Sequence, residues 1–249
     1  LKGKTALITG GSRGLGLQMA HALGEAGARI MLSAHKAEDR EQAAAELQEA
    51  GVAACAKHFP GHGDTDVDSH LALPRLSHGM DRLNAVELLP FEAAVKAGVA
   101  SVMTAHVVFA ALDDAVPATL SPKVLTPLLR DRMGYQGVII SDDLDMKAVA
   151  DHFPTAEMVR LGLLAGVDHF LCCRDLNRAR EAVEAVHRLA SSDSAMAARV
   201  RQSAERVRAL KRKFLGTYAP PDAREAMAIL RAPAHEKLVE QIRALVPRV

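Results

Sequence analysis

Short apolar runs alternate with longer amphipathic stretches along most of the chain. Six of the apolar runs have the length and the flanking glycine or polar residues of buried strands. They cover residues 5–9, 29–33, 53–57, 101–106, 137–141 and 168–172. Helical patterns lie between them, near residues 14–25, 38–50, 84–97, 122–133, 154–164 and 177–190. Strands separated by helices predict a parallel α/β sheet, either open and doubly wound or closed as a barrel.

The number of strands is too small for a complete barrel. Six strands are two fewer than a (β/α)₈ barrel contains. After about residue 192 the pattern is helical only, rich in Arg and Glu, with a break at Ala219-Pro220-Pro221. These C-terminal helices are expected to pack over whatever part of the sheet remains open.

The composition is that of a soluble globular protein with an aliphatic core: 49% of the 249 residues are hydrophobic, 3% are aromatic and none is Trp. A net charge of +1 argues against a nucleic acid or an anionic membrane as partner. No apolar run approaches the ~20 residues of a membrane span, and the first residues lack the layout of a signal peptide. Cys55, Cys172 and Cys173 form no disulfide framework, so a reducing, cytoplasmic environment is expected.

A glycine-rich turn, TGGSRGLG, joins the first predicted strand to the first predicted helix. Glycines there let the backbone approach a pyrophosphate, and the helix N-terminus offers free N–H groups to it. Residues 1–51 resemble the opening of the short-chain dehydrogenase/reductase family, whose glycine motif is TGxxxGxG, which implies a Rossmann-type NAD(P) loop. A tight strand–helix turn without a ligand is the alternative. The candidate cofactor-binding residues are Gly10, Ser12, Arg13, Gly14 and Gly16.

The catalytic residues of that dehydrogenase family are absent. Its members pair a tyrosine with a lysine four residues later, whereas Tyr135 is followed there by Ile139 and Tyr218 by Asp222. Dehydrogenase chemistry is therefore excluded, and no cofactor is expected to be required. We expect NAD(P) to bind no more tightly than roughly millimolar, which is about 4 kcal/mol.

The densest polar stretch is KHFPGHGDTDVDSH, which begins at Lys57 directly after a predicted strand. The carboxyl end of a parallel strand is where such folds place their sites. One alternative is a metal site, because His58 and His62 are four residues apart, but no other group has a recognisable ligand spacing and no metal is expected. The other alternative is a polar loop around a Pro-Gly turn.

This stretch is the first of four, and SVMTAHVVF, PATLSPKVLTPLLR and GVIISDDLDMKAV follow it along the chain. In this order the four resemble the bacterial β-N-acetylhexosaminidases of glycoside hydrolase family three, over about residues 52–249. The resemblance implies the late strands of a (β/α)₈ barrel. It also implies a retaining hydrolase that acts on N-acetylglucosamine-containing glycosides.

The resemblance carries roles to five residues. Asp142 matches the nucleophile, Asp68 and His70 match an acid/base dyad, and Lys57 and His58 match residues that hold the N-acetylglucosamine. A retaining glycosidase needs a carboxylate nucleophile and an acid/base with a pKa near the working pH. A histidine titrates near ~6.5 unaided, and an aspartate two positions away can orient it and support its charged form.

Four residues near these motifs can be explained by structural rather than catalytic roles. Asp143 is expected to cap a helix rather than to react. His106 either lines the site or is a core histidine. Arg82 and Glu87 are expected to be solvated charges on a helix face.

Residues 1–51 and 52–249 thus resemble two different families, with a boundary near Ala50-Gly51-Val52. We expect an engineered chimera, with a natural recombinant as the alternative, merged into one α/β domain whose sheet of about six strands is open or incompletely closed. A half barrel exposes sheet edges, so a homodimer is expected. The earlier family-three strands, which grip the sugar, are not visible. Hydrolysis is therefore expected to be weak or lost, and the alternative is a fold chimera without catalysis.

Overall fold

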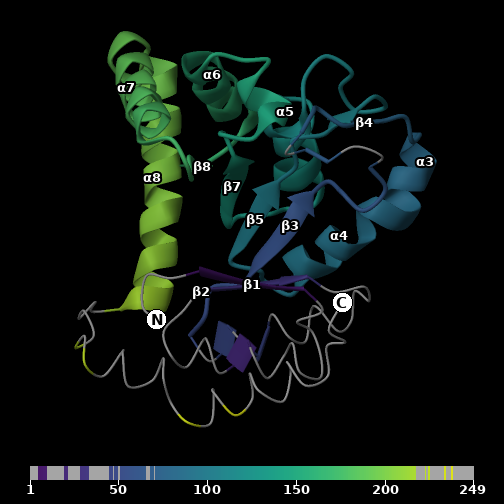
Figure 1. Ribbon diagram of the computed structural model, residues 1–249, viewed down its shortest axis with the longest axis vertical. Coiled ribbons are helices and arrows are strands. Elements are labelled where there is room, and N and C mark those ends of the chain that lie inside the picture. The colour runs from purple at the N-terminus through teal and green to yellow at the C-terminus, as the bar shows by residue number, and fades with distance from the viewer. Residues whose placement is uncertain are drawn as a thin grey trace.

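The centre of the molecule is an open parallel sheet of four strands, in the order β3-β5-β7-β8 (Figure 1). The computed structural model describes residues 5–9, 20–21, 29–33, 45–46, 48–49, 51–65, 68–69, 71–216, 222, 224, 233 and 237. The four strands are Cys55–Phe59 (β3), Ser101–Thr104 (β5), Val138–Asp143 (β7) and His169–Leu171 (β8). All neighbouring pairs are parallel, so the carboxyl ends of the four strands meet at one edge.

Two smaller parallel pairs accompany this sheet. Thr5–Thr9 (β1) pairs with Arg29–Ser33 (β2). The pair lies at the amino end of the central sheet, where β2 contacts β3 (Figure 1). Arg75–Leu76 (β4) pairs with Val108–Phe109 (β6). Within the described part of the chain, β1 and β2 form a sheet of their own and do not extend the central sheet by hydrogen bonding. The Rossmann-type extension expected from the sequence is therefore not confirmed.

Helices cover the sheet and connect its strands. They are Met80–Arg82 (α3), the π-helix Leu83–Glu87 (η1), Leu89–Lys96 (α4), the 3₁₀-helix Ala118–Leu120 (η2), the π-helix Leu125–Arg132 (η3), Lys147–Ala150 (α5), Thr155–Ala165 (α6), Leu176–Ser192 (α7) and Ser194–Leu215 (α8). Asp193 begins α8 as an N-cap, accepting hydrogen bonds from the N–H groups of Ala195 and Met196. None of the described helices is long and apolar enough to cross a bilayer.

The core is aliphatic, as the composition predicts. Residues of three strands and of η3 fill the space on the helix side of the sheet; Phe59, Val102, Leu125, Leu129 and Ile139 are all fully buried. A second cluster joins α6, α7 and α8. A third cluster, of Leu120, Leu144, Val149 and Met158, lies around the segment that follows β7.

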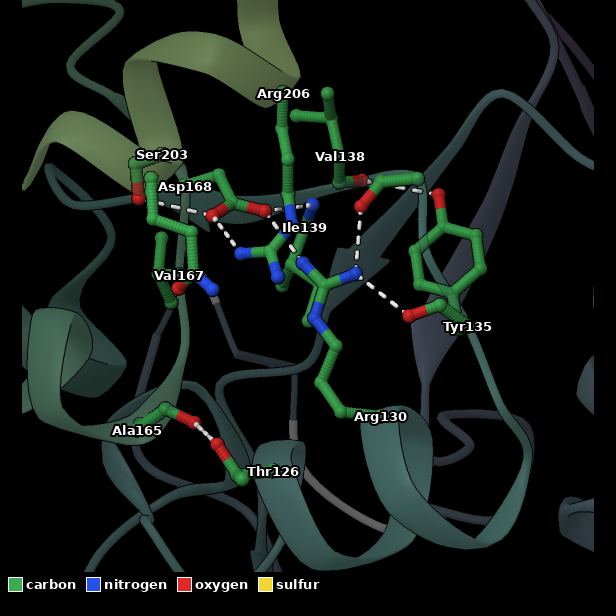
Figure 2. Close-up of polar contacts among 12 residues, drawn as sticks. Thr126, Arg130, Tyr135, Val138, Ile139, Ala165, Val167, Asp168, Ser203 and Arg206 are labelled. Atoms are coloured by element: carbon green, nitrogen blue, oxygen red, sulfur yellow. Dashed lines mark hydrogen bonds and ion pairs between the residues drawn. The ribbon is translucent and has the colours of Figure 1, made fainter. Parts of the chain in front are cut away.

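The long helix α8 is attached to the amino end of the sheet by a cluster of charges around Asp168 (Figure 2). This carboxylate is fully buried and forms ion pairs with Arg130, Arg199 at 3.1 Å and Arg206 at 3.2 Å. Its Oδ1 also accepts a hydrogen bond from the Ser203 hydroxyl at 2.9 Å. The cluster joins η3, the start of β8 and α8, and it lies opposite the edge that carries the polar motifs.

The strands expected from the sequence are all present, and the differences lie in short elements. The strands β4 and β6 have two residues each, too few for a sequence pattern to reveal. The helix expected over 122–133 is a π-helix over 125–132. Of the expected helices 14–25 and 38–50, the described residues 20–21, 45–46 and 48–49 are helical. The remainder of both lies outside the described residues.

Candidate active site

Two strand ends bring the central pair of residues together. β3 ends in Lys57-His58-Phe59, and β7 ends in Asp142-Asp143. His58 Nε2 lies 3.5 Å from Asp142 Oδ2, and the two side chains are 22% and 14% exposed. Burial lowers the pKa of the His58 ring to about 4, and the neighbouring Asp142 carboxylate only partly opposes this shift. His58 is therefore neutral near pH 7 and acts there as a hydrogen-bonding group rather than as a cation.

The carboxylate of Asp142 is oriented by the backbone beside it. Its Oδ1 accepts a hydrogen bond from the N–H of Asp143 at 2.9 Å. Because this oxygen is held by the backbone, the other oxygen, Oδ2, is the one that faces His58 across the edge of the sheet. Lys57 is half-buried next to His58 on the same strand end. The structure thus brings Lys57, His58 and Asp142 to the same edge.

Asp143 joins the ends of β7 and β8. Its Oδ1 accepts hydrogen bonds from the N–H groups of Asp145 at 3.1 Å and Cys173 at 3.0 Å. The helix that follows, α5, has Met146 at its N-cap position, without a side-chain cap. The expectation that Asp143 caps a helix is therefore wrong, because its carboxylate bridges two loops instead.

A second carboxylate, Asp145, completes this bridge and was not singled out by the sequence. Its Oδ2 accepts hydrogen bonds from the N–H groups of Arg174 at 2.8 Å and Asp175 at 3.0 Å. Arg178 Nε lies 2.7 Å from its other oxygen. Burial alone would raise the pKa of Asp145, but the two N–H donors and Arg178 outweigh burial and lower it. Asp145 therefore stays charged and holds the segment after β8 in place.

His106 follows β5 and is fully buried. Its Nε2 lies 3.1 Å from the carbonyl oxygen of Asp143, and its Nδ1 lies 2.9 Å from Thr119 Oγ1. Burial lowers the pKa of this ring, against the opposing effect of Asp142. Of the two alternatives considered for His106, the structure supports the core histidine, which contacts the backbone next to Asp142.

The loop that carries Asp68 is fastened to the helix after β7. His62 Nε2 lies 3.1 Å from the hydroxyl of Ser69, which is buried. The carbonyl of Ser69 accepts a hydrogen bond from the N–H of Ala148 at the start of α5, at 3.2 Å. Asp68 itself is exposed. The other expected member of the dyad, His70, lies outside the described residues.

The start of the same loop is held by a network of charges. Asp64 Oδ2 lies 2.8 Å from His78 Nε2 and 3.4 Å from an Arg82 nitrogen. Arg82 also pairs with Glu87 Oε1 at 3.0 Å, and the Glu87 side chain is only 8% exposed. A β-carbon at Gly61 would come within 2.9 Å of Glu87 Cγ. Glu87 is thus a buried support of the loop, and the expectation that it is a solvated charge is wrong.

Two further expectations from the sequence concern ligands. Among the described residues, no three His, Cys, Asp or Glu side chains are arranged to hold a metal ion. The candidate dinucleotide-binding residues Gly10, Ser12, Arg13, Gly14 and Gly16 lie outside the described residues. Sequence reasoning missed two residues: Asp145, whose carboxylate accepts from backbone N–H groups, and Ser69, whose hydroxyl contacts His62 and whose carbonyl accepts from Ala148. Their positions in the motifs SDDLDM and TDVDSH are the only signal that could have revealed them.

Known proteins with similar sequences are glycoside hydrolases. A β-hexosaminidase from Alkalilimnicola ehrlichii is 41% identical over 144 residues, which are 58% of this chain and 40% of that protein. β-Hexosaminidase A from Pseudoalteromonas piscicida is 43% identical over 134 residues, 49% of this chain and 22% of that protein. The chain thus matches less than half the length of these relatives.

Known structures that are similar to this chain are also family 3 glycoside hydrolases. A family 3 β-N-acetylglucosaminidase from Paenibacillus sp. str. FPU-7 superposes with a TM-score of 0.69 at 39% identity, covering 75% of this chain and 36% of that one. A fungal multi-domain family 3 β-N-acetylglucosaminidase superposes with a TM-score of 0.74 at 32% identity, covering 86% of this chain and 26% of that one. The central sheet is therefore part of the barrel-like α/β fold of these enzymes.

The family model described as "Glycosyl hydrolase family 3 N terminal domain" matches residues 38–210. The match begins ahead of the boundary that the sequence suggested near residue 51. The comparisons lend no support to a dehydrogenase segment or to a chimera. The chain belongs to glycosyl hydrolase family 3, whose N-terminal domain is matched by residues 38–210, and the chemistry of that family is glycoside hydrolysis.

Proposed function

We propose that the site at the carboxyl edge of the sheet hydrolyses β-N-acetylglucosaminides with retention of the anomeric configuration. The observation that carries this proposal is the Asp142 carboxylate, with Oδ1 held by the Asp143 N–H and Oδ2 facing His58 at 3.5 Å. A nucleophilic carboxylate needs one oxygen oriented toward the sugar and a fixed geometry for attack. Relatives named β-hexosaminidase and β-N-acetylglucosaminidase support the substrate class.

In this mechanism Asp142 attacks the anomeric carbon and displaces the leaving group. A covalent glycosyl-enzyme forms while His70, supported by Asp68, gives its proton to the leaving oxygen. The same histidine then takes a proton from water, which attacks the anomeric carbon and releases Asp142. His58 is neutral, so it can donate a hydrogen bond to a sugar hydroxyl without neutralising the nucleophile. Lys57 supplies a cationic donor beside it.

The attachment of the loop supports the role of Asp68 and His70. Ser69 stands between these two residues, and its carbonyl is bound to α5, the helix that follows the strand of Asp142. A dyad fixed to this helix has a defined place relative to the nucleophile. The role of His70 itself rests on the family resemblance.

Turnover by this chain alone is expected to be at least about a thousandfold below that of a full-length relative. Holding a substrate in a productive pose can be worth about 7–11 kcal/mol of the barrier. The chain matches less than half the length of its relatives, so part of the sugar-holding surface is not expected here.

The test is hydrolysis of an aryl β-N-acetylglucosaminide, with a 5-fluoro glycosyl fluoride used to trap the glycosyl-enzyme for mass spectrometry. We expect the label on Asp142 and loss of both labelling and turnover in Asp142→Asn. Asp131→Asn, an exposed carboxylate on η3, is the matched control and should behave as the wild type. Turnover that persists in Asp142→Asn would contradict the assigned nucleophile. If the wild type shows no turnover and takes up no label, a non-catalytic role is favoured.

The cysteines bear on the environment in which this activity would occur. Cys55, Cys172 and Cys173 are all free. Burial raises the pKa of Cys55 to about 11, so this thiol stays protonated and unreactive. Free thiols support our proposal of a reducing, cytoplasmic environment.

A further inference from the structure

A buried chain of hydrogen bonds runs from β5 to the residue beside Asp142. Thr104, His106 and Thr119 are all fully buried. Thr104 Oγ1 lies 2.8 Å from Thr119 Oγ1, which lies 2.9 Å from His106 Nδ1. His106 Nε2 then lies 3.1 Å from the carbonyl oxygen of Asp143. The chain therefore connects β5, η2 and the end of β7.

The partners of the ring define where its proton lies. The carbonyl oxygen of Asp143 can only accept, so His106 Nε2 carries a proton. Full burial disfavours a second proton on the ring, and this leaves Nδ1 as an acceptor. The Thr119 hydroxyl has a single hydrogen to donate, and two acceptors lie within reach of it: His106 Nδ1 and the carbonyl oxygen of Ala105 at 3.0 Å.

The peptide that His106 contacts is held from both sides. Its carbonyl oxygen belongs to Asp143 and accepts from His106, and its N–H belongs to Leu144 and donates to the Leu171 carbonyl at 2.8 Å. The N–H of Asp143, one peptide earlier, donates to Asp142 Oδ1. The direction of that N–H, and so the orientation of the Asp142 carboxylate, depends on how residue 143 is held.

We propose that His106 is a positioning residue that orients the Asp142 carboxylate through the backbone of Asp143, with Thr119 fixing the ring. This inference rests on the proposed function of Asp142 as the nucleophile. His106 touches neither the sugar nor the reacting atoms in this arrangement. Its effect is to keep the attacking oxygen in line with the anomeric carbon.

The first test compares His106→Phe with His106→Gln. Phe keeps a ring of similar size without an N–H, whereas the Gln amide can place an N–H near the position of Nε2. We expect His106→Phe to slow labelling of Asp142 by the fluoro sugar about 100-fold, the effect of a displacement of roughly 1 Å. KM should change by less than about twofold, because binding before the chemical step is unaffected. His106→Gln should recover most of the rate.

Equal rates in His106→Phe and the wild type would overturn the proposal. So would equal losses in His106→Phe and His106→Gln, which would indicate a packing role only. If His106→Phe fails to fold, Thr119→Val and Thr119→Ser decide the matter. The first removes the hydroxyl and should slow labelling, and the second retains the hydroxyl and should not. An unchanged labelling rate in Thr119→Val would also overturn the proposal.

A measurement without turnover separates this inference from the proposed function. If the wild type is not labelled at all, the proposed function fails, and NMR of the protein with ¹⁵N-labelled histidine judges the positioning role. The signals lost in His106→Phe should be those of a neutral ring protonated on Nε2. The backbone amide signal of Asp143 should move further in His106→Phe than in His106→Gln. A neutral ring protonated on Nδ1, or an Asp143 amide that does not move, would overturn the proposal.

Discussion

At the scale of single residues, burial decides the chemical state of the site. The motif identifies His58 and His106 as candidates, but it does not say whether they are charged. Burial lowers the pKa of both rings, although Asp142 lies near each of them. Neutral rings can donate hydrogen bonds without placing a positive charge beside the Asp142 carboxylate. The residue types were predictable from the sequence, whereas their protonation depends on neighbours that are distant along the chain.

The lowered pKa of His58 predicts a specific pH dependence of stability. The folded state holds this ring at a pKa of about 4, against 6.5 as the ordinary value, so the unfolded state binds more protons between these two pH values. The free energy of unfolding therefore falls as the pH drops from about 6.5 to about 4, by up to roughly 3 kcal/mol from this group.

Urea unfolding of the wild type and His58→Gln at several pH values checks this. Between pH 6.5 and pH 4, the free energy of unfolding should fall by about 2–3 kcal/mol less in His58→Gln than in the wild type. His152→Gln, at an exposed position, is the control and should keep the wild-type profile. Identical profiles in His58→Gln and the wild type would show that His58 is not buried in its neutral form.

At the scale of elements, the acid/base loop is a separate piece that must be attached to the sheet. The Asp64 network holds its start, and the His62–Ser69 contact holds its later part. The Ser69 carbonyl also satisfies the N–H of Ala148, one of the free N–H groups in the first turn of α5. The loop and the helix after the nucleophile strand thus stabilise each other.

Loss of the Ser69 hydroxyl should loosen this attachment. A typical intramolecular hydrogen bond contributes about 1 kcal/mol net, so Ser69→Ala should lower the ratio of attached to detached loop roughly fivefold. We expect hydrogen exchange at Ala148 to become up to about fivefold faster, and kcat for the aryl glycoside to fall by at most the same factor. Ser77→Ala, at an exposed position, is the matched control. Unchanged exchange at Ala148 in Ser69→Ala would mean that the hydroxyl does not hold the loop.

At the scale of the whole molecule, the strands followed from the sequence and the long-range contacts did not. Runs such as GVIIS and SVMT are apolar, short and bounded by glycine or polar residues, so they predict strands directly. The Asp168 cluster joins residues from Arg130 to Arg206, and no local pattern shows that these side chains meet. Glu87 has the spacing of a surface charge, but the approach of Gly61 buries it. Contacts of this kind depend on how elements pack, which periodicity does not describe.

The open sheet has a consequence for assembly. Among the described residues, β3 and β8 are the outer strands of the central sheet, and β2 lies against β3 without pairing with it. Unpaired strand edges offer N–H and C=O groups to another chain, and a two-fold arrangement satisfies both copies at once. The chain is therefore expected to form a dimer through one of these edges.

Light scattering across a range of concentrations measures dimerisation, and hydrogen exchange shows which edge strand forms the interface. We expect the mass to approach that of two chains as the concentration rises. Amides of β3 or β8 should become more protected over the same range. The inner strands β5 and β7 are the internal control, because their hydrogen bonds are already made within the sheet and their protection should not change. A monomer at every concentration would mean that other parts of the chain cover both edges. Dimerisation without added protection at β3 or β8 would place the interface on the helices instead.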